Sequence, residues 1–124
     1  MDERVEIQAV PPGDRGGMAA LIARADLVAL LSEYESQGIA VMEALALQRP
    51  VLVAATSALQ EFADRSLART VHLKSTPEEV AEVVVGQLRQ PLVPMNVALP
   101  TWDDCAASLL ALYETIKWRI PCAS

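Results

Sequence analysis

Two short, uninterrupted apolar runs, at residues 27–31 and 51–54, constrain the fold more than any other feature of the sequence. Runs of this length, bounded by polar residues and proline, are typical of strands that are buried on both faces, as in parallel sheets. Between them, residues 39–47 fit a helix, which must end before Pro50 because proline disfavours helical geometry in the residue that precedes it. A strand, a helix and a second strand in this order predict a parallel pair joined by a crossover.

Further segments extend this alternation along the chain. Thr76, Pro77 and Glu79 form the clearest helix start, because threonine caps the first turn, proline suits its first position and glutamate completes a capping box. The other expected elements are strands at 5–10 and 70–73, helices at 17–24, 76–89 and 101–118, a polar loop with a helical turn at 55–64, and an irregular linker at 90–100. The sequence therefore predicts a single α/β domain over residues 1–124, with a doubly wound, Rossmann-like parallel sheet flanked by helices.

Composition narrows the classes of function. The hydrophobic fraction is 52%, but Asp26, Glu33 and Glu43 interrupt the longest apolar stretches, and no run reaches the roughly 18 residues of a transmembrane helix. The formal net charge of −6, with scattered Lys and Arg residues, argues against nucleic acid as a partner. Cys105 and Cys122 match no metal-ligand spacing, so we expect reduced thiols and no metal site. The N-terminal residues do not resemble a secretory signal, and we expect a cytoplasmic protein.

A polar segment follows the first apolar run, at the position where parallel sheets bind their ligands. Residues 32–38 (SEYESQG) lead into the helix expected at 39–47, whose unpaired amides favour an anion such as phosphate. Glu35 precedes this helix, and Glu43 lies just over one turn inside it. Because carboxylates accept hydrogen bonds but repel phosphate, the pair suits hydroxyl groups that flank a phosphate, as in a nucleoside diphosphate sugar. The alternative is that Glu35 is a solvated charge in a loop and Glu43 is a surface residue of the helix, and that neither binds a ligand.

These motifs, in this order, resemble the donor-binding domain of GT-B glycosyltransferases of family 4, the glycosyl transferases group 1. That family carries two glutamates separated by seven residues, matched here by Glu35 and Glu43, and then a G-x-P-V turn in which Gln48 stands where glycine is common. The segments that carry the resemblance are residues 25–28, 32–46, 49–54 and 56–61, together with Trp102 and the helix that extends to Tyr113. The resemblance thus covers most of the chain.

The resemblance implies a retaining glycosyltransferase that uses a nucleoside diphosphate sugar as donor and needs no metal or other cofactor. In such an enzyme Glu35 would be the catalytic residue that touches the transferred sugar, and Glu43 would accept hydrogen bonds from the ribose hydroxyls. Backbone amides of Gly38, Ile39 and Ala40 would bind the sugar and the phosphate. The common E-G-F-G of the family is E-S-Q-G at residues 35–38 here, which leaves the identity of the sugar open.

The resemblance reaches only the later part of the donor-binding half of a GT-B fold. We expect the acceptor domain and the family's basic Arg/Lys pair to be missing from this chain, and the chain alone to transfer no sugar, because no domain orients the acceptor. The alternatives are a non-catalytic α/β interaction module or degenerate transferase domain, and a fragment that self-associates through an uncovered apolar surface. A signalling receiver is disfavoured because residues 11–13 (PPG) and 54–56 (AAT) stand where it needs acidic residues.

Overall fold

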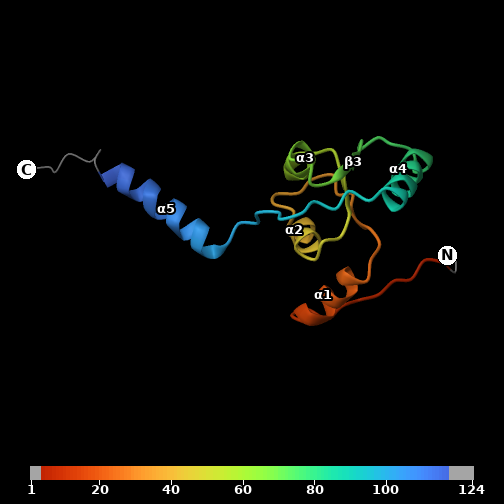
Figure 1. Ribbon diagram of the computed structural model, residues 1–124, viewed down its shortest axis with the longest axis horizontal. Helices are drawn as coiled ribbons and strands as arrows, with labels where there is room; N and C mark the ends of the chain where they lie inside the picture. Colours follow the sequence, from red (N-terminus) through yellow and green to blue (C-terminus); the bar gives the residue numbers. More distant parts are fainter. Residues whose placement is uncertain (1–3, 118–124) are drawn as a thin grey trace, which may run out of the picture.

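Three parallel strands in the order β1-β2-β3 form the centre of the computed structural model, which describes residues 4–117 (Figure 1). The strands are β1 (Val28–Leu30), β2 (Val51–Ala54) and β3 (Arg69–Val71). Val28 pairs with Val51, and Leu52 pairs with Arg69. Every residue of β2 is at most 2% exposed. The two apolar runs of the sequence therefore form adjacent parallel strands, and the second is the fully buried one.

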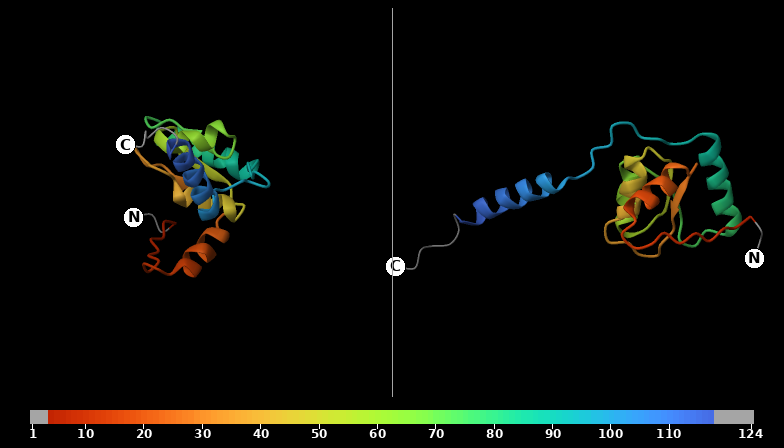
Figure 2. Two further views of the ribbon diagram at one scale, coloured as in Figure 1. Left: turned by 90° about the vertical axis from the view of Figure 1, so that its left-hand side faces the viewer. Right: turned by 90° about the horizontal axis from the view of Figure 1, so that it is seen from below.

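Helices lie on both faces of this sheet (Figures 1 and 2). α2 (Ile39–Ala46) connects β1 to β2, and α3 (Ser57–Asp64) connects β2 to β3. Because the strands follow one another across the sheet in chain order and such crossovers are right-handed, both helices lie on the same face. α4 (Pro77–Arg89) packs on the other face. The main core cluster lies between β2, α2 and α3 and contains Val41, Ala44, Leu45, Val51, Val53, Ala54, Leu59, Phe62, Leu67 and Ala68. This arrangement confirms the predicted doubly wound, Rossmann-like α/β fold.

Two helices flank this body. α1 (Arg15–Ala23) precedes β1 and packs against α2. α5 (Trp102–Lys117) lies apart from the sheet, beyond residues 90–101, which form neither helix nor strand (Figure 2). Residues 102–116 of α5 are exposed. The assignment of residues 1–124 to one domain stays a prediction. Cys122 and position 118, the expected end of the last helix, lie outside the described residues.

Two predicted elements were wrong. Residues 5–10 form no strand, and Val5 and Ile7 are 58% and 79% exposed, because the segment extends away from the sheet and has no neighbouring strand to pair with. Residues 57–64 form α3 rather than a loop, because Leu59 and Phe62, three residues apart, both enter the core. The polar residues between them hide this helical spacing in the sequence.

The remaining boundaries agree with the predicted ones to within a few residues. α1 begins two residues before the predicted start, because the Asp14 carboxylate caps it by accepting a hydrogen bond from the Gly17 amide (2.8 Å). The capping box of α4 is confirmed: Thr76 Oγ1 accepts from the Glu79 amide (3.3 Å), and the Thr76 amide donates to Glu79 Oε2 (2.8 Å). Both helices thus begin where side chains satisfy otherwise unpaired amides.

A buried glutamine attaches α4 to the sheet. Gln87 is 0% exposed, and its Nε2 donates to the backbone oxygen of Val51 (3.2 Å). Its Oε1 accepts from the backbone amide of Leu92 (3.1 Å). One side chain therefore joins the start of β2 to the segment that leaves α4, and both of its polar ends are satisfied.

We expect Gln87→Leu to lower the free energy of unfolding by ~1–3 kcal/mol, because it leaves the Val51 carbonyl and the Leu92 amide without their partner. Urea denaturation followed by circular dichroism measures this change. Gln90→Leu is the matched control, since Gln90 is exposed at the end of the same helix. Equal stability of the two variants would contradict the structural role of Gln87.

Candidate functional site

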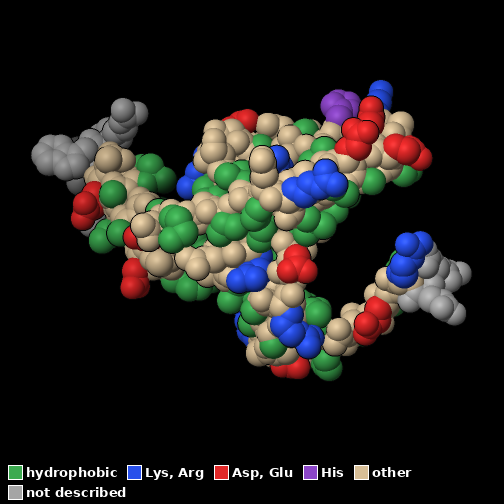
Figure 3. Space-filling view, turned by 45° about the vertical axis from the view of Figure 1, so that its right-hand side comes forward, with side chains coloured by type: hydrophobic (Ala, Val, Ile, Leu, Met, Phe, Trp, Pro, Cys, Tyr) green, Lys and Arg blue, Asp and Glu red, His purple; other side chains and the backbone are tan. Residues whose placement is uncertain are grey.

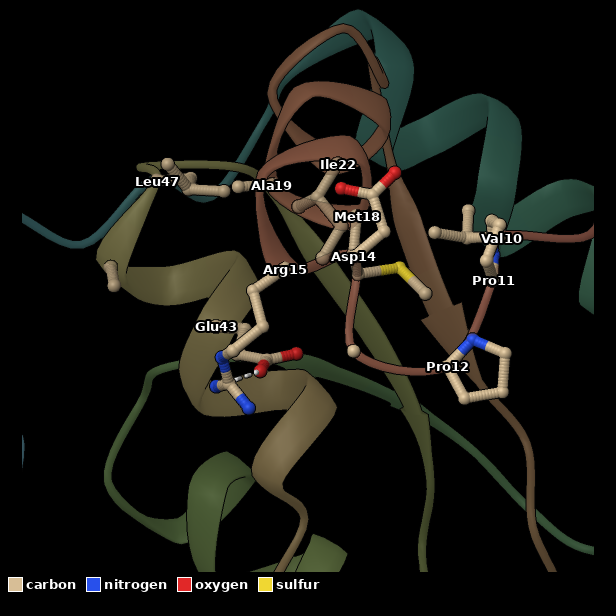
Figure 4. Close-up of a pocket in the computed structure, with 12 residues that line it drawn as sticks. Val10, Pro11, Pro12, Asp14, Arg15, Met18, Ala19, Ile22, Glu43 and Leu47 are labelled. Atoms are coloured by element: carbon tan, nitrogen blue, oxygen red, sulfur yellow. Dashed lines mark hydrogen bonds and ion pairs between the residues drawn. The ribbon is translucent and has the colours of Figure 1, made fainter.

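A pocket of about 560 Å³ opens between α1, α2 and the segment that precedes α1 (Figure 4). Most of its wall is apolar, and its charged members are Asp14, Arg15 and Glu43. The remaining lining residues are Val10, Pro11, Pro12, Gly13, Met18, Ala19, Ile22, Ala46 and Leu47. Its volume lies within the range of small-molecule sites.

The side chains of Arg15 and Glu43 point toward each other at this pocket (Figure 4). Arg15 is the first residue of α1, and Glu43 lies in the middle of α2. Arg15 Nη2 donates to Glu43 Oε1 at 3.4 Å, with the arginine side chain 86% exposed and the glutamate side chain 37% exposed. The ion pair thus connects the two helices at the solvent-facing side of the pocket.

The loop after β1 is attached to the start of α3. The amide of Glu35 donates to Ser57 Oγ (2.9 Å), and the amide of Ala58 donates to the backbone oxygen of Glu35 (3.2 Å). Thr56 Oγ1 donates to the backbone oxygen of Glu33 (3.1 Å). The sequence had assigned no role to Thr56 or Ser57. Their position after β2, next to the end of β1 in a parallel sheet, is the signal that could have indicated one.

The Glu35 carboxylate binds its own loop. Its Oε1 accepts hydrogen bonds from the amides of Ser36 (3.0 Å) and Gln37 (3.3 Å). These bonds stabilise the ionised form, so backbone donors at Gln37, then Gly38, and also Ser36 lower the pKa of Glu35 below its ordinary value. Glu35 is therefore a charged group that holds the loop before α2 in shape.

The start of α2 is shaped by Gly38. Its φ is +74°, and an added Cβ would lie 2.8 Å from Cε2 of Phe62, so a side chain at this position would strain the backbone and strike the core. No side chain caps α2 there. The amides of Ile39 and Ala40 have no hydrogen-bond acceptor among the described residues. Two amide donors without a partner in this part of the chain thus lie at the positive end of the helix.

The predicted site residues fall into two groups. Glu35, Gly38, Ile39 and Ala40 lie together at the start of α2, whereas Glu43 lines the pocket on the side facing α1. None of the first group lines that pocket. Sequence reasoning missed Arg15, because its partner lies 28 positions away and no local pattern connects the two residues.

Charged side chains form small groups on the face of the molecule drawn in Figure 3. On the face drawn in Figure 3, Lys and Arg side chains lie beside Asp and Glu side chains and make no continuous basic patch. Within residues 4–117, no three His, Cys, Asp or Glu side chains are grouped closely enough to hold a metal ion. No helix in the described part of the chain has the length and apolar character needed to cross a membrane.

We expect the amide signals of Ser36 and Gln37 to titrate with Glu35, with a midpoint below the usual range of glutamate. A lowered pKa in the folded state means that these hydrogen bonds contribute stability at pH values above the unfolded pKa, and that the contribution is lost as the pH falls through the lowered pKa. Two-dimensional ¹H–¹⁵N NMR across the acidic range measures the midpoint. Glu35→Gln should abolish the titration, and a midpoint at or above the ordinary value would contradict the observed contacts.

Comparison with known proteins gives consistent matches. Residues 5–90 match the family described as glycosyl transferases group 1. The chain is 33% identical over 119 residues to the D-inositol 3-phosphate glycosyltransferase of Jonesia denitrificans, covering 90% of this chain and 28% of that relative. It is 30% identical over 114 residues to the protein of the same name from Mycobacterium avium, covering 85% of this chain and 27% of that relative.

A third relative carries a different name. The GDP-mannose-dependent alpha-(1-6)-phosphatidylinositol dimannoside mannosyltransferase of Mycobacterium tuberculosis is 31% identical over 104 residues, which cover 79% of this chain and 27% of that relative. The chain thus spans roughly a quarter of the length of these curated relatives. No solved structure gives a significant match. The resemblance inferred from the Glu35 and Glu43 motifs is confirmed, and the chain belongs to the glycosyl transferases group 1 family.

Proposed function

We propose that this chain is the nucleotide-sugar-binding part of a retaining, metal-independent glycosyltransferase of GT-B fold. The reaction moves a sugar from a nucleoside diphosphate sugar to an acceptor held by a part of the protein outside this chain. Family membership supports sugar transfer, and one observation supports the role of this part: Glu43 lines a pocket of about 560 Å³ on the same helix whose first amides have no acceptor among the described residues.

The pocket suits the nucleoside of such a donor. Pro12, Met18 and Ile22 offer apolar surface of the kind that a planar base covers. Glu43 offers carboxylate oxygens at the same pocket, and ribose hydroxyls donate hydrogen bonds to such acceptors. An apolar wall beside the Glu43 carboxylate therefore suits a nucleoside better than a free sugar or a free phosphate.

The start of α2 suits the other half of the donor. The amides of Ile39 and Ala40, which have no acceptor among the described residues, provide hydrogen-bond donors and a positive helix end for the diphosphate. Glu35, in the loop just before them, is the residue to which we assign contact with the transferred sugar. In this arrangement the sugar–phosphate bond breaks and the diphosphate leaves with the bonding electron pair. The oxygen of the acceptor hydroxyl bonds to the same face of the sugar, and its proton passes to the departing phosphate oxygen.

Glu43→Gln should weaken binding of a nucleoside diphosphate sugar by ~1–3 kcal/mol, because an amide replaces the charged acceptor of the ribose hydroxyls. NMR shift titrations of the 124-residue chain with GDP-mannose and UDP-glucose measure the affinity. We expect millimolar-class binding, worth about 4 kcal/mol, because the net charge of −6 opposes an anionic ligand.

Glu82→Gln is the matched control for this experiment, since Glu82 is an exposed glutamate of α4, which packs on the opposite face of the sheet. Its affinity should equal that of the unaltered chain. If Glu43→Gln binds as tightly as the control, Glu43 does not contact the ribose. If the unaltered chain binds neither donor, the non-catalytic interaction module becomes the better description.

A further inference from the structure

The ion pair between Arg15 and Glu43 constrains the carboxylate to which we assign the ribose hydroxyls. Arg15 Nη2 lies 3.4 Å from Glu43 Oε1, and the two residues come from different helices. Oε2 of Glu43 has no hydrogen-bond partner among the described residues. One carboxylate oxygen is thus occupied by the protein, and the other is left to accept from a ligand.

The other carboxylate of the pocket makes no ion pair with Arg15 among residues 4–117. Asp14 is the other carboxylate in the lining, but its Oδ1 accepts from the Gly17 amide at 2.8 Å and caps α1. The same cap fixes the start of α1, where the backbone of Arg15 lies. Arg15 therefore extends from an anchored helix end toward Glu43, as Figure 4 shows.

A glutamate side chain has three rotatable bonds, and ordering it when a ligand binds costs free energy. Holding one oxygen in place beforehand removes part of this cost, because the second oxygen is then already oriented. Exposed ion pairs contribute little to folding stability, so the pair is a weak explanation for the stability of the fold. Orientation of Glu43 is the effect that the pair is well suited to supply.

We propose that Arg15 is a positioning residue for donor binding, acting through Glu43 to orient its free oxygen toward the ribose hydroxyls. The inference rests on the proposed function, since it takes the nucleoside to be the occupant of the pocket. It assigns to Arg15 a contribution that depends on two partners: the Glu43 carboxylate in the protein and the 2′ and 3′ hydroxyls in the ligand.

The test compares UDP and GDP with their 2′,3′-dideoxy forms on the 124-residue chain, by NMR shift titration. Arg15→Met keeps an unbranched apolar stem of similar character and removes the charged guanidinium. It should weaken binding of UDP or GDP about two- to fivefold, the effect of losing one exposed ion pair, and leave binding of the dideoxy forms unchanged. In the Glu43→Gln background the same substitution should have no further effect, because the carboxylate it orients is gone.

Arg24→Met is the matched control, an exposed arginine at the other end of α1 and outside the pocket lining. It should leave all four affinities unchanged, and Arg15→Met should leave the melting temperature within about 2 °C of the unaltered chain.

Three outcomes would overturn the proposal. Equal weakening of ribose and dideoxy ligands, or weakening that persists in the Glu43→Gln background, would indicate a structural role for Arg15. Tighter binding by Arg15→Met would show that the arginine competes with the ribose. The proposed function fails separately: in that case the unaltered chain either binds no nucleotide or binds the ribose and dideoxy forms equally.

Discussion

The burial of β2 between two parallel neighbours is the constraint on which the rest of the structure depends. Parallel strands cannot be joined by tight turns, so each needs a crossover helix, and these helices bring α2 and α3 onto one face. The same parallel direction places the loops after β1 and β2 at one edge of the sheet. The hydrogen bonds from Glu35 to Ser57 and from Thr56 to Glu33 follow from this proximity. The part of the candidate site around Glu35 is thus a consequence of strand direction.

The two glutamates of the motif have different environments, although they are close in sequence. Glu35 lies before the helix, where its carboxylate meets backbone amides of its own loop. Glu43 lies over one turn inside α2, on the side that faces α1, where it meets a guanidinium. In the proposed function, Glu35 is the carboxylate at the transferred sugar and Glu43 is the carboxylate at the nucleoside. The spacing of the motif therefore has a physical basis: a shorter interval would place both carboxylates at the helix start.

Sequence reasoning succeeded where local chemistry decides the structure and failed where a distant partner decides it. The run at residues 51–54 became β2 without any shift, and the Thr76 capping box was present as expected. Gln48, which stands where the family commonly has glycine, has a positive φ of 54°, in the left-handed region that glycine adopts most easily. Residues 5–10 had the composition of a strand but no neighbouring strand, and the Arg15–Glu43 pair depends on the packing of two helices. Neither could be read from local periodicity.

The exposed site is connected to the core through Gly38. The left-handed backbone of this residue turns the loop into α2, and the ring of Phe62, 7% exposed, fills the space where a Cβ would be. Phe62 belongs to α3 and packs in the cluster that also contains Val41 and Leu45 of α2. The position of the Ile39 and Ala40 amides is therefore fixed by core packing beneath them and by Glu35 before them. Because packed interiors respond to the loss of even a methylene group, a change at Phe62 would move the first turn of α2 without touching any ligand.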